Sequence, residues 1–346
     1  MNKLTKVGFS ALCGSLAAIS SANAGDMSVT GGVDMSWISL ENAATGNPIG
    51  IGSNLTFKGS GELDNGWTVD YTVANLNGNA YSSSAVAIGM GGLGTLNLNS
   101  GDSANGIKAM DDKIPTAWEE ATGAGLSTGI KNVGGVSTSM NVQYATPTVL
   151  GTSLVVAYAP AMGQADTADK GSGGTRTTKG NGYDATLNIN PSLGQEVLSG
   201  LNLFVGAHVS ERISNSSVEE DIYEGVGGVT YSLGPVSLGY AKSGFVTGQE
   251  GSGTMTHYKG TMYGIAFNVN DDLSVSYGHH EMQQYNDEGA SRTGQASDTF
   301  IEVDSMQVAY SMGGASIRLA ETQGKNLFYT KARDEDATTI SVSLAF

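Results

Sequence analysis

Residues 54–73 read NLTFKGSGELDNGWTVDYTV, and this stretch decides the fold. Apolar or small residues occupy every second position on both sides of a short polar segment: Leu55, Phe57, Gly59, Trp67, Val69, Tyr71 and Val73. Polar residues such as Thr68, Asp70 and Thr72 lie between them. A period of two residues predicts a β-strand with one apolar face. The intervening Asp64-Asn65-Gly66 has the composition of a tight turn, so the stretch predicts a β-hairpin.

The same alternation recurs along the chain, for example in residues 29–37, 201–209 and 340–346. From it we predict sixteen strands, at residues 27–39, 51–63, 67–75, 84–91, 95–100, 136–146, 152–160, 181–191, 200–211, 221–233, 236–246, 258–269, 273–284, 300–312, 315–323 and 337–346. The connections between these strands alternate long and short without exception. The short ones have turn composition, as in Gly234-Pro235 and Gly313-Gly314, whereas the long ones are Gly- and Ser-rich or acidic.

Short turns at one end and long loops at the other are typical of an outer-membrane barrel. A soluble β-sandwich has no reason to alternate in this way. An even number of strands also returns the last strand beside the first, which leaves no edge unpaired. The sequence therefore predicts an all-β fold, a sixteen-stranded antiparallel transmembrane β-barrel with lipid outside and water inside.

Residues 1–24 have the features of a secretory signal peptide, and we assign residues 25–346 to the barrel. Lys3 and Lys6 form a short basic region, residues 7–19 are apolar, and Ala22-Asn23-Ala24 supplies a small-residue cleavage pattern. The apolar run is too short to cross a bilayer as a helix. We therefore expect export through the general secretory pathway.

Composition narrows the class further. The chain has 17 Lys and Arg against 33 Asp and Glu, and loss of Lys3 and Lys6 with the signal changes the formal charge from −16 to −18. So acidic a chain is a poor partner for nucleic acid, because phosphate contacts need Lys and Arg. The one cysteine, Cys13, lies in the signal. The exported protein is therefore held together without disulfides, as ladder hydrogen bonds allow in a closed barrel.

Three segments resemble the general porins of Gram-negative bacteria. Residues 54–73 resemble that family's second strand, first turn and third strand. VAIGMGGLGTLNLNSGD (86–102) resembles its fourth and fifth strands, and MNVQYATPTVLGTSLVVAY (140–158) its sixth and seventh. The second half of the chain matches in architecture only. The resemblance implies a homotrimer of sixteen-stranded barrels in the outer membrane, surrounded by outer-membrane lipid. It also implies that Phe346 is the C-terminal signal read by the barrel-assembly machinery.

The connection at Gly101–Gly135, after the fifth predicted strand, differs from the others in length and acidity. A connection that long normally has a function of its own. The resemblance assigns it to the family's third loop, which folds into the lumen and narrows the pore. By the same resemblance its carboxylates would face a basic ladder on the opposite wall, and the residues concerned are Asp111, Asp112, Glu119 and Glu120.

Few basic residues are available to form the other side of this expected constriction. Lys58 keeps the lysine of the family, but Asn54, Ser100 and Gln143 stand where arginines are usual. Strand alternation independently places Asn54, Lys58 and Gln143 on the water side. A pore lined by acids with few bases attracts cations, so we expect a modest cation preference. The alternative is that the loop acids are merely solvated.

Other motifs have ordinary explanations. The Gly89-x-Gly91-x-x-Gly94 string precedes alternating residues rather than a helix, so it predicts a turn and not a dinucleotide site. In a strand, His280 points away from its neighbours His279 and Glu281, so the three cannot share one ion. Asp271-Asp272 has carboxylates suited to Ca²⁺ but is a normal polar turn. We expect neither a cofactor nor a metal site.

The predicted function is passive diffusion of small hydrophilic solutes and ions through a water-filled channel, with no catalytic residue. An alternative within transport is a solute-specific channel with a binding site at the third loop. From a different class, a surface adhesin or an outer-membrane hydrolase remains open. The hydrolase needs a Ser/His pair at the barrel rim, and the adhesin predicts binding without conductance.

Overall fold

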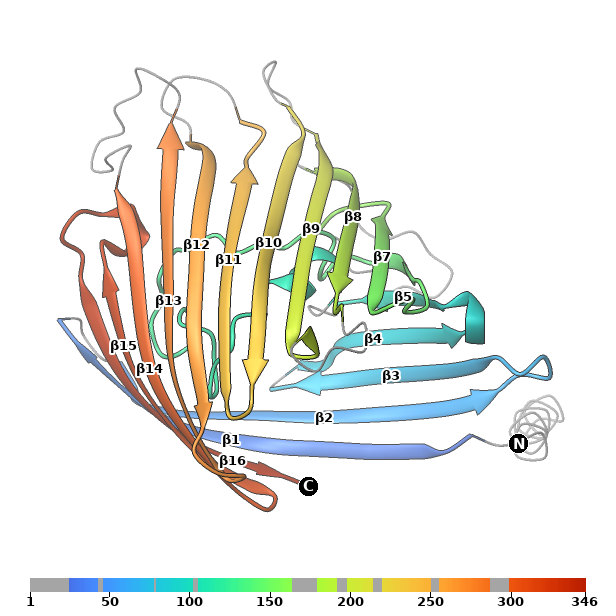
Figure 1. Ribbon diagram of the computed structural model, residues 1–346, viewed down its shortest axis with the longest axis horizontal. Helices are drawn as coiled ribbons and strands as arrows, with labels where there is room; N and C mark the ends of the chain where they lie inside the picture. The colour runs from blue at the N-terminus through green and yellow to red at the C-terminus, as the bar shows by residue number, and fades with distance from the viewer. Residues whose placement is uncertain are drawn as a thin grey trace, which may run out of the picture.

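The computed structural model describes residues 25–42, 46–77, 79–101, 105–163, 179–191, 198–213, 220–249, 255–286 and 299–346. Within these ranges, sixteen strands each pair antiparallel with the next, and β16 pairs with β1 to close the barrel (Figure 1). The strands are β1 (Met27–Glu41), β2 (Ile49–Glu62), β3 (Thr68–Leu76), β4 (Asn79–Gly89), β5 (Thr95–Ser100), β6 (Asn141–Ala145), β7 (Thr152–Ala159), β8 (Lys179–Ile189), β9 (Leu201–Arg212), β10 (Ile222–Leu233), β11 (Val236–Val246), β12 (Met255–Asn268), β13 (Leu273–Asn286), β14 (Phe300–Met312), β15 (Ala315–Lys325) and β16 (Glu335–Ala345).

The helical elements are short 3₁₀ turns: η1 (Gly91–Leu93), η2 (Gly106–Met110) and η4 (Leu327–Tyr329). None of the helices in the described ranges is long and apolar enough to span a membrane. The predicted signal peptide, residues 1–24, lies outside the described residues, so its assignment stays a prediction.

The sixteen-stranded barrel confirms the predicted fold, with two local corrections. The sixth strand begins at Asn141 rather than at residue 136. The Asn141 side chain donates to the carbonyls of Val136 and Ser139, and these bonds hold residues 136–140 in the loop. The sequence predicts a long connection between β3 and β4, but β4 begins at Asn79, with only two residues between it and Leu76. The polar, Ser-rich start of β4 was taken for loop because it lacks the apolar alternation that marks the other strands.

The two faces of the wall differ as the period of two requires. In β14 the side chains of Met306, Val308 and Tyr310 are exposed on the outer face, whereas Ser305 and Gln307 are buried on the inner face. A wall that faces lipid carries apolar side chains on its outside, because apolar surface has a lower free energy in contact with lipid than in contact with water. The inner face is buried on this side because a loop covers it.

That loop is residues 101–140, between β5 and β6, which we call the third loop (residues 102–104, including Asp102, lie outside the described residues). Its trace crosses the barrel interior behind β10 to β13 in Figure 1. Ile107, Met110 and Val133 of the loop pack on Phe204 and Met262 of the wall, so the lumen has a local apolar core. A second cluster joins Ala121 to β12–β14 and to Leu327 and Tyr329 of the β15–β16 loop. The sequence had predicted a purely aqueous interior, and these clusters correct it.

The C-terminal residue closes the ladder. Gly31 N–H donates to the Phe346 carbonyl at 2.9 Å, and Phe346 N–H donates to the Gly31 carbonyl at 3.0 Å. The Phe346 ring itself is exposed on the outside. The backbone of this residue, as distinct from its ring, thus completes the β1–β16 seam.

We expect deletion of Phe346 to lower the stability of the refolded barrel more than Phe346→Ala does. The deletion removes both closing hydrogen bonds, worth about 2 kcal/mol together, whereas the alanine variant keeps them. The measurement is the urea midpoint of each variant in detergent micelles, followed by the mobility shift between folded and heated protein on gels. Equal loss in the two variants would show that the ring, and not the closing pair, is responsible.

Candidate functional site

Two buried carboxylates on the inner wall hold the ends of the third loop. Asp184 of β8 accepts from Ile107 N–H at 2.7 Å and from Val136 N–H at 3.2 Å, and it pairs with His208 Nδ1 at 2.5 Å. Glu224 of β10 accepts from the N–H groups of Gly134 and Gly135. Carboxylates that accept several backbone N–H groups make strong, directional bonds. These contacts pin both ends of the loop to the β8–β10 wall.

The far side of the loop is held by neutral groups on β13 and β14. Ser276 Oγ accepts from Ala117 N–H at 2.8 Å. The Gln307 side chain accepts from Glu119 N–H at 2.9 Å and donates to the Glu119 carbonyl at 2.7 Å. Between the two sets of anchors, Ile114 and Pro115 lie directly against Gly239 of β11 and Gly264 of β12, so the central segment of the loop runs along the inner wall of the lumen. None of these anchors is predicted from the sequence, although Asp184, His208 and Gln307 share the phase of the inward-facing residues.

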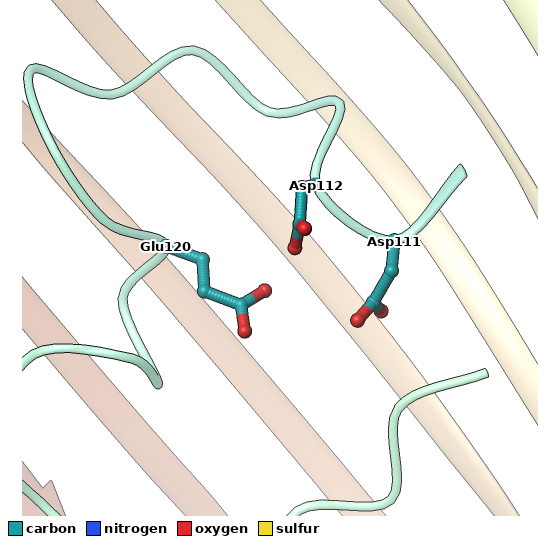
Figure 2. A group of neighbouring side chains, drawn as sticks. All are labelled: Asp111, Asp112 and Glu120. Carbon is teal, nitrogen blue, oxygen red and sulfur yellow. The ribbon is translucent and has the colours of Figure 1, made fainter. Parts of the chain in front are cut away.

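Three acidic residues in the central segment of the third loop lie close together. Asp111, Asp112 and Glu120 each offer a carboxylate oxygen, and these oxygens all lie within 4.8 Å of one another (Figure 2). Asp111 is buried at 4% exposure, Glu120 is half-buried and Asp112 is exposed. Lys108 pairs with Asp111 at 2.5 Å and is the nearest counter-charge. At an effective dielectric of about 20, two unit charges 4.8 Å apart repel by about 3 kcal/mol.

This crowding changes the acidity of the cluster. Burial, then the hydrogen bond to Asp112 and the charges of Asp111 and Asp112, raise the pKa of Glu120 to about 8. Burial also raises the pKa of Asp111, although Lys108 opposes the change. The pKa of Glu119 is raised by burial and by Asp112, and Arg318 acts in the opposite direction. At neutral pH the cluster therefore holds a proton, mainly on Glu120, and it gains negative charge as the pH rises through 8.

A basic residue that was not predicted from the sequence contacts the loop close to this cluster. Arg318 of β15 lies 5.6 Å from the Trp118 ring centroid and 3.5 Å from Asp34, which also accepts from Ser341 Oγ. Arg318 alternates with the outward-facing Ile317 and Leu319, so the strand phase carried the signal for it. The segments that resemble the porin family lie in the first half of the chain, so the resemblance gives no assignment for Arg318.

The four predicted wall residues have different surroundings. Gln143 accepts from Gly106 N–H at 3.0 Å and so supports the start of the third loop. Asn54 and Lys58 of β2 are exposed, in opposite phase to the outward Phe57. Ser100 is only 5% exposed at the end of β5, where it shares the phase of Leu98, so it does not line the open passage.

The histidines of β13 lie on opposite faces, as predicted. His279 contacts Asp304 at 2.8 Å and stacks on Tyr263, an outward-facing residue of β12. His280 is buried on the inner side at 4% exposure. The Asp271-Asp272 segment is a polar turn in which Asn270 Oδ1 accepts from Asp272 N–H at 2.9 Å.

A closed transmembrane barrel with a long loop folded into its lumen defines the class of this protein, which is an outer-membrane channel. The chain belongs to the Gram-negative porin family, whose model matches residues 10–346. It is therefore a pore in the outer membrane through which small hydrophilic solutes diffuse passively. No curated protein matches its sequence.

Solved structures share the fold at low identity. An anion-selective porin from Comamonas acidovorans is 15% identical with a TM-score of 0.64, covering 93% of this chain and 100% of that one. Salmonella typhi OmpF, solved with daunomycin, is 14% identical with a TM-score of 0.65, covering 94% and 99%. Vibrio cholerae OmpT is 10% identical with a TM-score of 0.62, covering 94% and 98%.

We expect Asp184→Ala to loosen the third loop and raise single-channel conductance by roughly 1.5-fold or more. The variant removes buried charge-assisted hydrogen bonds, each worth about 1.5–3 kcal/mol, from both ends of the loop. Planar-bilayer recording gives the conductance and its open-channel noise. Asp70→Ala is the matched control, since Asp70 lies on β3 in the inward phase and makes no bond to the described part of the loop. Unchanged conductance in Asp184→Ala would show that the anchors do not set the pore size.

Proposed function

We propose that the third loop forms the constriction of this porin and that its acids give the pore a modest preference for cations. The observation that carries the proposal is the convergence of Asp111, Asp112 and Glu120 on the part of the loop that lies inside the lumen. Glu119 adds a fourth carboxylate one residue away. Exposed charges interact over about 8 Å at physiological salt, and a narrow pore focuses their field further.

Counter-charge nearby is limited, which supports the sign of the preference. Lys108 neutralises one carboxylate of the cluster, and Arg318 of β15 is shared with Asp34 of β1, two strands away on the same wall. Lys58 adds a base on β2, whereas Asn54 and Gln143 add none. The barrel shape does not determine the sign, because the similarly folded Comamonas protein is described as anion-selective. Within residues 101–140 the sequence has five acids and three lysines: Asp102, Asp111, Asp112, Glu119 and Glu120 against Lys108, Lys113 and Lys131.

The remaining assignments are proposals of the same kind. Homotrimer formation, outer-membrane lipid around the barrel and recognition of Phe346 by the barrel-assembly machinery are supported by membership of the porin family and by the apolar outer wall. Mass measurement of the unheated protein in a mild detergent tests the trimer directly.

The wild-type pore is expected to give a cation-selective reversal potential in a salt gradient across a planar bilayer. Asp112→Asn combined with Glu119→Gln removes two negative charges without changing shape. At 0.1 M ionic strength, where the Debye length is about 10 Å, we expect the cation-to-anion permeability ratio to fall by roughly twofold or more. A clear anion preference in the wild type would refute the proposal.

Cation preference is also expected to increase between pH 6 and pH 9. Because the pKa of Glu120 is raised to about 8, this carboxyl is largely neutral below that pH and charged above it. Glu120→Gln should flatten the pH dependence and hold the permeability ratio near its low-pH value. Reversal potentials recorded in a pH series at constant salt provide the measurement. The same slope in wild type and variant would assign the titration to another group.

A further inference from the structure

We propose that the inner wall of this porin carries a weak binding site for a neutral sugar ring, separate from the acids of the third loop. The site is a hollow of about 390 Å³, which falls within the range of roughly 300–1,000 Å³ for ligand pockets. It is lined by Gly32, Asp34, Gly52, Asn54, Leu76 and Ser343. The inference goes beyond ion selectivity, because these residues belong to the wall and not to the loop.

The strand register brings these residues together on the inner face. Asp34 of β1 is paired with Gly52 of β2, and Gly32 of β1 is paired with Asn54 of β2. Asn54 is in turn paired with Leu76 at the end of β3. Residues that are paired across neighbouring strands point to the same side of a sheet, and Asn54 is in the inward phase. The hollow therefore opens into the lumen.

Two glycines create the space. A Cβ atom on Gly32 would lie 3.7 Å from Asn54 Oδ1, and a Cβ atom on Gly52 would lie 3.3 Å from Asn77 Oδ1. The Asn77 side chain is fixed there, because its Oδ1 accepts from Ser53 N–H at 3.0 Å. The missing side chains leave room for a small ring to lie on the backbone between the two amide groups. Leu76 offers apolar surface to the C–H face of such a ring.

The polar groups around the hollow match hydroxyl groups. Asp34 Oδ2 lies 3.5 Å from Arg318 Nη1, and the two side chains remain 47% and 25% exposed. Asn54 is exposed, and its amide bonds to none of the described residues. A carboxylate accepts, a guanidinium donates and an amide does both. A sugar hydroxyl also donates and accepts, so it can use all three groups.

The charges at the hollow favour a neutral occupant. Asp34 and Arg318 carry opposite charges and compensate each other. Arg318 opposes a cation and Asp34 opposes an anion, whereas a zwitterion such as an amino acid must first separate the pair. A neutral polyhydroxyl solute leaves the pair intact. The hollow is open on the lumen side, so binding is weak, and a channel needs weak binding because its solute must leave again.

The position of the hollow gives two ways to detect an occupant. Arg318, the partner of Asp34, lies 5.6 Å from the Trp118 ring centroid on the third loop. A sugar in the hollow therefore sits beside the loop, where it obstructs the ion current and changes the surroundings of Trp118. The other two tryptophans, Trp37 and Trp67, are in the outward phase of β1 and of the β3 hairpin.

The test is the conductance of the full-length porin in planar bilayers as D-glucose is added at constant ionic strength. We expect a saturable decrease, whereas polyethylene glycol of similar mass lowers the conductance linearly through viscosity. Gly52→Val fills the hollow and should raise the half-saturating concentration by about fivefold or more. Asn54→Ala should raise it by about threefold or more. Gly59→Val is the matched control on β2, because a Cβ there meets nothing within 4 Å and Gly59 is in phase with the outward Phe57.

Asp34→Asn provides a gain of function that damage to the fold cannot produce. The variant leaves the Arg318 charge uncompensated, so gluconate, the acid of the same sugar, should lower the conductance with saturation in Asp34→Asn but not in the wild type. Glucose should bind this variant more weakly than it binds the wild type.

Tryptophan fluorescence of the detergent-solubilised barrel measures binding without current. We expect a saturable change with glucose that disappears in Trp118→Phe. If the loop is not the constriction, the block is lost but this titration remains, whereas failure of the sugar site removes both. The proposal is overturned by a linear, viscosity-like response to glucose, by unchanged half-saturation in Gly52→Val, or by saturation with glycine in place of glucose.

Discussion

Closure of the backbone ladder is the constraint on which the rest of this structure depends. In a bilayer an unpaired N–H or carbonyl group costs several kcal/mol, so a strand wall survives there only if its last strand bonds to its first. The β1–β16 register and the Gly31–Phe346 pair meet this requirement. Once closed, sixteen strands enclose a space too wide for side chains from the wall to fill.

The unfilled interior explains the chemistry of the third loop. Its backbone N–H groups enter the lumen without sheet partners, and buried Asp184 and Glu224 accept several of them. Apolar side chains such as Ile107 cover the wall beneath. A loop held in this way carries its remaining charges into a restricted, partly dry space. There burial, and after it the neighbouring acids, raises the pKa of Glu120, because bulk water does not screen the charges.

Selectivity is consequently a property of a few side chains, not of the fold. The barrel superimposes on porins with 10–15% identity, one of them described as anion-selective. What differs is which charges are attached to the common frame. Here the inward-facing Arg318 contacts the Trp118 ring and pairs with Asp34. Its charge also opposes the rise in the pKa of Glu119. Among the described residues, the ion pair of the loop carboxylates is the one between Asp111 and Lys108.

The sequence by itself determined the strand number, the closed topology and the inward phase of Asn54, Lys58 and Gln143, because side-chain alternation is a local property of each strand. It also located the acid-rich loop. Local pattern did not determine where β6 begins or how short the β3–β4 connection is, since both depend on which backbone groups find partners. Only the tertiary structure decided that three loop carboxylates meet and that His280 faces them. It also placed Arg318 beside Trp118, because the contacts of His280 and Arg318 with the loop join residues more than 150 positions apart.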